Sequence, residues 1–242
     1  MKKILVIGGT GFIGYHLIKK SLKNYYNVTS ISSRKPSKLR FLKKVKYIIC
    51  DISKKKFLYK AIKKKFDYVV NLGGYVDHKK KIKTYNSHYL GVKNLADFFL
   101  KKDITSFVQM GSSLEYGSLN SPHKEEMKTN VRKLRSVYAS SKLKATNYLI
   151  LLNKKYDFPC TILRLYLTYG PKQDQNRLIP IIINSCLKNY KFDCSDGKQF
   201  RDFLYIDDLI NLIICVLKNK SSRGEIINTG SGKTQKIKDV IK

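Results

Sequence analysis

Several residue types that define other protein classes are missing or scarce in this chain of 242 residues. Tryptophan is absent, and the five cysteines are scattered and form no Cys-x-x-Cys pair. This pattern argues against a disulfide framework or a zinc site and favours a reducing compartment. No apolar run reaches the roughly 20 residues that a membrane span requires, and no signal-peptide pattern follows the start. We therefore expect a cytoplasmic protein without a membrane or metal partner.

Acidic residues are also scarce, at 17 against 49 basic residues, which gives a formal net charge of +32. Clustered cations would indicate nucleic-acid binding, because neutralised phosphates release their counterions. Here the basic residues are mostly lysines and lie along the whole chain, without one patch interleaved by aromatic residues. We interpret the charge as a solvated surface that also attracts anionic small molecules, and we expect no specific nucleic-acid partner.

Short runs rich in Val and Ile alternate with longer segments of helical period. Strands are expected at Lys3–Ile7, Val28–Ser32, Tyr47–Cys50, Tyr68–Leu72, Ser106–Met110 and Cys160–Leu165. Helices are expected at Phe12–Lys23, Phe57–Lys65, Lys83–Lys101, Val137–Tyr156 and Arg177–Asn189. The alternation predicts an α/β fold: a Rossmann-like, doubly wound parallel sheet that binds ligands at the carboxyl ends of its strands.

The first expected strand runs directly into a glycine-rich turn, Gly8-Gly-Thr-Gly11-Phe-Ile-Gly14, and then into a helix. Gly8 permits the tight turn, Gly11 lets the backbone approach a pyrophosphate, and Gly14 lets the helix pack closely on the strand. The free N–H groups and positive dipole at the start of the helix complete a phosphate site. The context therefore predicts a dinucleotide-binding turn.

The motif Gly8–Gly14 resembles the signature of the extended short-chain dehydrogenases, a family of sugar-nucleotide epimerases, dehydratases and reductases. The resemblance continues in order along nearly the whole chain, through the motifs Cys50-Asp51-Ile52, Asn71-Leu72-Gly73-Gly74, Gly111–Gly117, Tyr138–Lys142, Tyr169-Gly170-Pro171 and Arg201–Asp208. It implies an NAD(P)-dependent enzyme that acts on a nucleotide sugar and forms a homodimer through the segments Lys83–Lys101 and Val137–Tyr156.

The resemblance implies a division into a cofactor domain, residues 1–170, and a smaller substrate-binding region, residues 171–242. The second region is expected to be interleaved with the first. It also looks incomplete, because family members usually continue beyond the position of Lys242.

The cofactor contacts are expected along the glycine turn and after the next three strands. They are Gly8, Thr10, Gly11, Phe12, Ile13, Gly14, Ser33, Arg34, Asp51, Ile52, Leu72, Gly73 and Gly74, with Tyr138 and Lys142 at the reacting end. Asp51 takes the family position that binds the adenine amino group. The second expected strand ends in Ser33-Arg34 with no carboxylate for ribose hydroxyls, and a guanidinium would bind a 2′-phosphate. This favours NADP, with NAD as the alternative.

The resemblance assigns the catalytic set to Ser112, Tyr138 and Lys142. The Tyr-x-x-x-Lys spacing alone is not diagnostic, because it recurs at Tyr15, Tyr59, Tyr75 and Tyr89. Only Tyr138 opens a helix after a strand that ends in Ser112-Ser113. Residues four apart share a helix face, so Lys142 lies under Tyr138 and favours the phenolate, which exchanges a proton with the substrate hydroxyl. Ser112 would hydrogen-bond the developing oxyanion, with Ser113 as the fallback.

The residues after Ser112 narrow the reaction. Dehydratases of the family carry an acidic pair there, whereas this chain has Ser113 and Leu114, which cannot remove a carbon-bound proton. Glu115 comes one place later and, by strand alternation, should face away. Dehydration and decarboxylation are therefore disfavoured. What remains is hydride transfer at sugar carbon 4, by a 4-keto-6-deoxyhexose reductase or, alternatively, by a 4-epimerase with tightly bound NAD.

The substrate half is less informative. Arg201 matches the family arginine that contacts the nucleotide diphosphate, with a salt bridge to Asp202 or Asp207 as the structural alternative. His88 stands where the family usually has Asn, and we expect it to be buried and hydrogen-bonded. A protein that binds a dinucleotide without catalysis is the remaining alternative, although such a protein would be expected to lose Tyr138 or Lys142.

Overall fold

The computed structural model describes residues 1–242 and contains a seven-stranded sheet in the order β3-β2-β1-β4-β5-β6-β9. All its neighbouring strands pair in parallel. The strands are β1 Lys3–Ile7, β2 Asn27–Ser32, β3 Lys46–Ile49, β4 Tyr68–Asn71, β5 Ser106–Met110, β6 Cys160–Leu165 and β9 Ile226–Thr229. The order reverses direction between β1 and β4, which creates a crevice at the carboxyl ends of these strands.

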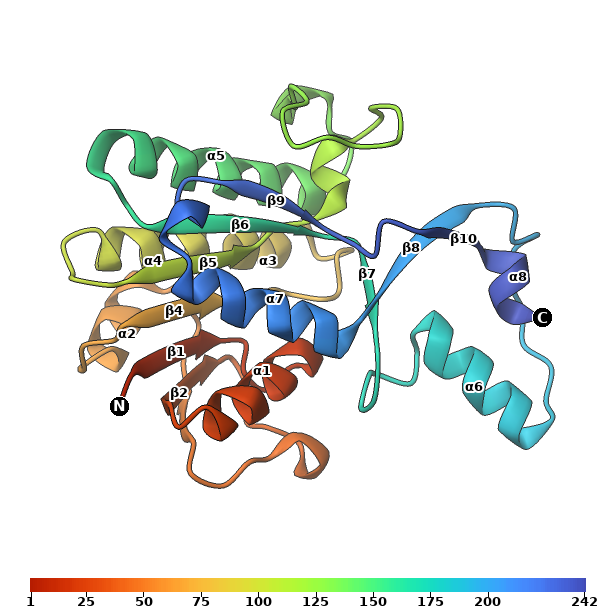
Figure 1. The fold of residues 1–242 in the computed structure, drawn as a ribbon, viewed down its shortest axis with the longest axis horizontal. Coiled ribbons are helices and arrows are strands. Elements are labelled where there is room, and N and C mark those ends of the chain that lie inside the picture. The colour runs from red at the N-terminus through yellow and green to blue at the C-terminus, as the bar shows by residue number, and fades with distance from the viewer.

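Helices cover both faces of this sheet (Figure 1). One face carries α2 Lys55–Ala61, α4 Gly91–Phe99 and α5 Val137–Tyr156, and the other carries α1 Phe12–Lys23 and α7 Ile206–Lys218. Each face has its own apolar core, with Leu95 and Leu149 fully buried in one and Leu17 and Ile213 in the other. The central strands β1, β4, β5 and β6 are almost entirely buried, as expected for a sheet covered by two helical layers.

A smaller three-stranded sheet, in the order β10-β8-β7, extends beyond the carboxyl ends of the main strands (Figure 1). Its strands are β7 Leu167–Tyr169, β8 Phe200–Tyr205 and β10 Thr234–Lys236, and it lies near α6 Leu178–Lys188 and α8 Ile237–Ile241. The segment before α4 comprises α3 Lys81–Tyr85 and a π-helical stretch, η2 Asn86–Leu90. Short 3₁₀ turns complete the fold: η1 Lys38–Arg40, η3 Ser113–Tyr116, η4 Val131–Lys133 and η5 Lys220–Ser222.

The expected doubly wound sheet is confirmed, and the six predicted strands occur within one residue of their expected bounds. The helices at Phe12–Lys23 and Val137–Tyr156 are confirmed, whereas the one expected at Phe57–Lys65 begins earlier and ends at Ala61. The second sheet begins with β7, before Pro171, and continues with β8; the chain then returns to the main sheet through α7 and β9 and ends with β10 in the second sheet. The division at residue 170 therefore stays a prediction. No helix is long and apolar enough to span a membrane.

Candidate functional site

The glycine-rich turn connects β1 to α1 at the crevice. Gly8 has a φ of +78°, and a Cβ there would lie 2.9 Å from the backbone nitrogen of Gly73 on the β4 turn. A Cβ on Gly14 would lie 2.3 Å from the carbonyl oxygen of Gly8. A Cβ on Gly11, by contrast, would approach only this same oxygen, at 3.3 Å. Gly8 and Gly14 are thus required by packing, whereas Gly11 leaves room beside the turn for a ligand.

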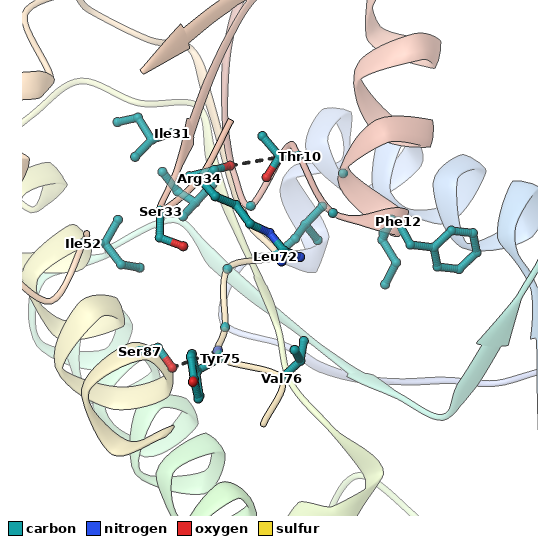
Figure 2. A pocket seen from close by; sticks show the side chains of 18 of the residues that line it. Thr10, Phe12, Ile31, Ser33, Arg34, Ile52, Leu72, Tyr75, Val76 and Ser87 are labelled. Atoms are coloured by element: carbon teal, nitrogen blue, oxygen red, sulfur yellow. Dashed lines mark hydrogen bonds between the residues drawn. The ribbon is translucent and has the colours of Figure 1, made fainter. Parts of the chain in front are cut away.

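This turn opens onto a cavity of about 840 Å³ at the carboxyl ends of the strands. The predicted cofactor residues that line it are Gly8, Thr10, Gly11, Phe12, Ile13, Gly14, Ser33, Arg34, Asp51, Ile52, Leu72, Gly73 and Gly74. Figure 2 shows side chains from the glycine turn, from the end of β2 and from the β4 turn around one space. The bare glycine turn at the start of α1 and the volume both fit a bound dinucleotide.

The end of the cavity near β2 and β3 carries hydroxyl and basic groups. The Ser32 hydroxyl accepts a hydrogen bond from the Thr10 backbone N–H at 3.4 Å. Ser33 and Arg34 line the cavity, and no carboxylate follows β2 before the η1 turn. Asp51 also lines it, and its Oδ1 accepts from the backbone N–H and the hydroxyl of Ser53. These bonds fix the carboxylate of Asp51 and leave Oδ2 free of partners within the chain.

The proposed catalytic lysine, Lys142, is on α5, and its Nζ reaches the end of β5. Lys142 is buried, its Nζ donates to the carbonyl oxygen of Met110 at 2.6 Å, and it lies 5.8 Å from the ring centroid of Tyr138. Helix α5 begins after Ser136, whose hydroxyl caps the Ala139 N–H at 3.4 Å. This cap sets the start of the helix one residue before Tyr138, so that Tyr138 and Lys142 are one turn apart on the face toward β5.

Ser112 lies two residues after the end of β5, and its hydroxyl accepts from the backbone N–H of Leu114 at 3.2 Å. It is therefore brought to the same end of β5 as the Nζ of Lys142, and its own hydroxyl hydrogen remains able to donate. Ser112, Tyr138 and Lys142 do not line the cofactor cavity itself. Their roles remain predictions.

Glu115 does not face this site, although the reason differs from the one expected. Residues Ser113–Tyr116 form a 3₁₀ turn instead of continuing the strand, so the argument from strand alternation was wrong. Glu115 is fully buried, and its carboxylate accepts from Arg164 Nε at 3.1 Å, the Thr146 hydroxyl at 2.8 Å and the Ser112 backbone N–H at 2.9 Å. The carboxylate is thus fully engaged in holding the turn after Ser112 against β6 and α5.

The predicted substrate residues, Ser113 and Arg201, do not lie together at the cavity. Ser113 opens the 3₁₀ turn, and Arg201 lies exposed on β8, where its guanidinium donates to the carbonyl oxygen of Phe200 at 2.7 Å. Arg201 makes no salt bridge to a carboxylate, and Asp202 instead accepts from the backbone N–H groups of Ser231 and Gly232. Neither serine nor arginine lines the cavity, and their role toward a substrate remains a prediction.

Sequence reasoning missed a set of hydrogen bonds between Arg40 and residues 172–174 at the cavity, which we call the clasp. Arg40, on the η1 turn, is buried and donates to the carbonyl oxygen of Lys172 at 2.7 Å and to Asp174 Oδ1 at 2.6 Å. Lys172 in turn donates to the Tyr15 hydroxyl and the Leu39 carbonyl, each at 2.8 Å. Arg40 and Asp174 both line the cavity, so the clasp joins its two walls. No sequence pattern signals this pair.

A second group that sequence reasoning did not connect consists of two histidines beside Tyr138. His88 is buried as expected, and its Nε2 donates to the carbonyl oxygen of Tyr75 at 3.1 Å. Burial and the positive charge of Lys142 lower the pKa of His88 to about 3. His78 stacks on the Tyr138 ring.

Arg177, at the start of α6, lines the cavity and was likewise not anticipated as a site residue.

These features define an enzyme of the Rossmann type with a dinucleotide-sized cavity and a Tyr-Lys pair at its central strand. Comparison with known families agrees: residues 4–230 match the model of the NAD dependent epimerase/dehydratase family. The chain belongs to this family of sugar-nucleotide enzymes.

Individual relatives have different activities. A Methanocaldococcus jannaschii protein provisionally named UDP-glucose 4-epimerase is 30% identical, over 98% of this chain and 80% of its own length. The structure of a dTDP-glucose 4,6-dehydratase from Bacillus anthracis with NAD has a TM-score of 0.87 at 25% identity, covering 100% of this chain and 79% of that one. A UDP-glucuronic acid 4-epimerase from Bacillus cereus, with UDP-glucuronic acid and NAD, has a TM-score of 0.83 at 26% identity, with coverage of 99% and 81%.

Proposed function

We propose that this enzyme transfers hydride at carbon 4 of a nucleotide sugar without eliminating water or carbon dioxide. The observation that carries the proposal is the position of Lys142, buried against the end of β5 and one helical turn from Tyr138, next to a cavity of dinucleotide size. A bound nicotinamide would supply the hydride acceptor and donor. The remaining chemistry belongs to residues of the chain.

In this proposal Tyr138 takes the proton from the sugar 4-hydroxyl during oxidation and returns it during reduction. The Lys142 ammonium, fixed by the Met110 carbonyl, stabilises the negative charge on the phenol oxygen. Ser112 donates its hydroxyl hydrogen to the sugar oxygen, since the Leu114 N–H engages only one lone pair of its oxygen and leaves the hydrogen free. The three groups come from the loop after β5 and the first turns of α5, where Ser112 and Lys142 are buried.

The residues of the 3₁₀ turn after Ser112 argue against an elimination step. Removing a proton from a sugar carbon requires a free base near Ser112. The positions that follow hold Ser113 and the exposed side chain of Leu114, and Glu115 is committed to Arg164, Thr146 and Ser112. Although a dehydratase is among the similar structures, this chain offers no comparable acid–base pair.

Among such reactions we favour 4-epimerisation with retained NAD, because of the clasp at the cavity. An epimerase reduces its own keto intermediate, so the dinucleotide need not leave between turnovers. The Arg40 guanidinium bridges the η1 turn to residues 172–174 across the cavity wall, and this contact opposes release of a bound dinucleotide. The similarity to two 4-epimerases supports the same activity.

A 4-ketoreductase that uses exchangeable NADPH is the second candidate, supported by one observation. The wall after β2 offers Ser33 and Arg34 and no carboxylate, an arrangement suited to a 2′-phosphate. The similar proteins with bound cofactor contain NAD, so the preference for NADP rests on these two residues alone.

Denaturing the purified protein and identifying the released dinucleotide separates the two candidates. Stoichiometric NAD together with interconversion of 4-epimers would support the epimerase. A cofactor-free protein that oxidises added NADPH in the presence of a nucleotide 4-keto sugar would support the reductase instead.

The clasp gives this experiment a sharper form. Substituting Arg40→Ala removes three hydrogen bonds and should speed dinucleotide release by about tenfold or more, since each such bond to a charged group contributes roughly 1.5 kcal/mol or more. Lys38→Ala, on the same η1 turn but without such bonds, is the matched control. Equal release rates from the two variants would contradict the retention argument.

We also propose a homodimer through the exposed sides of α4 and α5, as the family resemblance implies. Leu151, on α5, is an exposed apolar side chain in this region. Sedimentation velocity should give twice the chain mass, and a monomer at micromolar concentration would contradict this assembly.

A further inference from the structure

The loop after β4 places an imidazole on the ring of Tyr138. The His78 and Tyr138 ring centroids are 4.0 Å apart with an interplanar angle of 17°, which is a stacked arrangement. His78 itself is exposed, and the neighbouring residues Tyr75 and Val76, labelled in Figure 2, line the cofactor cavity. His78 therefore covers one face of the Tyr138 ring at the edge of the site.

A second imidazole meets the same ring from the side. The ring centroid of His88 lies 4.8 Å from that of Tyr138, with an interplanar angle of 88°, and 5.9 Å from that of His78. Space for it exists because residue 74 is glycine: a Cβ there would lie 2.1 Å from the His88 ring. The bond from His88 Nε2 to the Tyr75 carbonyl then ties the imidazole to the loop that carries His78. The Tyr138 ring is thus contacted on one face by His78 and on one edge by His88.

The surroundings of both imidazoles favour the neutral ring. Partial burial and the positive charges of Arg177 and Lys142 lower the pKa of His78, and only the neighbouring Asp77 opposes this shift. Burial, Lys142 and His78 lower the pKa of His88. A neutral ring can stack on the phenol without placing another cation beside Lys142, whose Nζ lies 5.8 Å from the centroid of the Tyr138 ring.

We propose that His78 is a positioning residue for proton transfer: its flat ring, stacked on Tyr138, holds the phenol in line with Lys142 and with the sugar hydroxyl. This inference rests on the proposed function, because it assigns His78 to the proton step of that reaction. The requirement is for a flat apolar face and not for the imidazole nitrogens. No other described part of the chain contributes a stacked ring to Tyr138.

The kinetic test compares two substitutions of His78. His78→Ala removes the stack and should lower kcat by about tenfold or more, because small misplacements of a catalytic group are costly, while KM changes by less than about threefold. His78→Phe restores a flat ring and should restore kcat to within about threefold of wild type. Lys79→Ala, an exposed neighbour on the same loop, is the matched control. Equal losses of kcat in both His78 variants, or no loss in His78→Ala, would overturn the proposal.

A second measurement needs no substrate. The chain has four histidines, so the His78 ring signal in labelled protein can be assigned by its loss in His78→Phe. The Tyr138 ring current should shift this signal upfield, and Tyr138→Leu should abolish the shift. The pKa from its titration should lie below the ordinary imidazole value of about 6.5 and rise in Lys142→Met. A signal that neither variant moves would overturn the stack.

The two measurements separate the inference from the proposed function. If the wild-type enzyme converts no nucleotide sugar while the resonance of His78 responds to Tyr138→Leu, the proposed reaction is wrong and the stack stands. If the enzyme converts nucleotide sugars and His78→Ala does so equally well, the proposed reaction stands and the positioning role is wrong.

Discussion

Removing the Glu115 carboxylate tests whether it is a structural group, as its contacts require, and not a catalytic base. The side chain is 0% exposed and its partner Arg164 is 2% exposed. Leaving a buried charge without its partner costs about 3 to 5 kcal/mol. Glu115→Ala should therefore lower the free energy of unfolding by this amount, which corresponds to a fall in Tm of about 6 to 20 °C for a domain of this size.

Urea titration followed by circular dichroism measures this cost, with Glu126→Ala as the control because that residue is exposed on a loop. The control should stay within about 0.5 kcal/mol of wild type. Replacing both partners, as in Glu115→Leu with Arg164→Met, should recover a large part of the loss, because paired apolar side chains leave no charge unsatisfied. A loss below about 1 kcal/mol in Glu115→Ala would refute the structural assignment. So would a Glu115→Gln variant that keeps full stability and loses all turnover.

Two other predictions concern the loop of His88 and the glycine turn. His88 has a folded-state pKa of about 3, below its value of 6.5 when unfolded, so its contribution to stability is complete above pH 6.5 and is lost as the pH falls toward 3. Between pH 7 and pH 5 this linkage amounts to about 2 kcal/mol, and His88→Asn should remove it; urea titrations that show the same pH dependence in both proteins would contradict the assignment. At the turn, Gly14→Ala should lower both stability and dinucleotide affinity, because its Cβ would lie 2.3 Å from the Gly8 oxygen. Gly11→Ala, with a nearest approach of 3.3 Å, should weaken dinucleotide binding alone; calorimetric titration with NAD and thermal unfolding distinguish the two, and equal destabilisation would count against the assigned roles.

The first half of the fold could be predicted because its signals are local. Buried parallel strands need apolar residues on both faces, and runs such as Lys3–Ile7 and Cys160–Leu165 satisfy this within a few residues. The glycine turn likewise carries its own geometric requirements in sequence, and all its residues except Gly9 line the expected cavity.

The second half could not be predicted in the same way. Strands β7 and β10 have three residues each and depend on pairing with β8, so no local run of apolar residues marks them. Helix α7 was missed although it is strongly apolar, because the alternation that identified the earlier helices had ended. The sequence contained the relevant residues, but only tertiary pairing decides their structure.

The clasp and the stacked histidine show the same limit within the site. Arg40 and Lys172 are 132 residues apart, and His78 and Tyr138 come from different loops and helices with no repeat between them. Glu115 illustrates the reverse case, in which the expected outcome was right for a wrong local reason. The Ser112 hydroxyl accepts a hydrogen bond from the Leu114 N–H and caps a 3₁₀ turn where a continuation of the strand was expected.

The most direct test of hydride transfer at carbon 4 uses nucleotide hexoses that carry deuterium at that carbon. The account predicts that the enzyme converts such a sugar to its 4-epimer with the deuterium still at carbon 4 and with no hydrogen from solvent at carbon 5. Formation of a 4-keto-6-deoxy sugar, or solvent hydrogen at carbon 5 of the product, would contradict it.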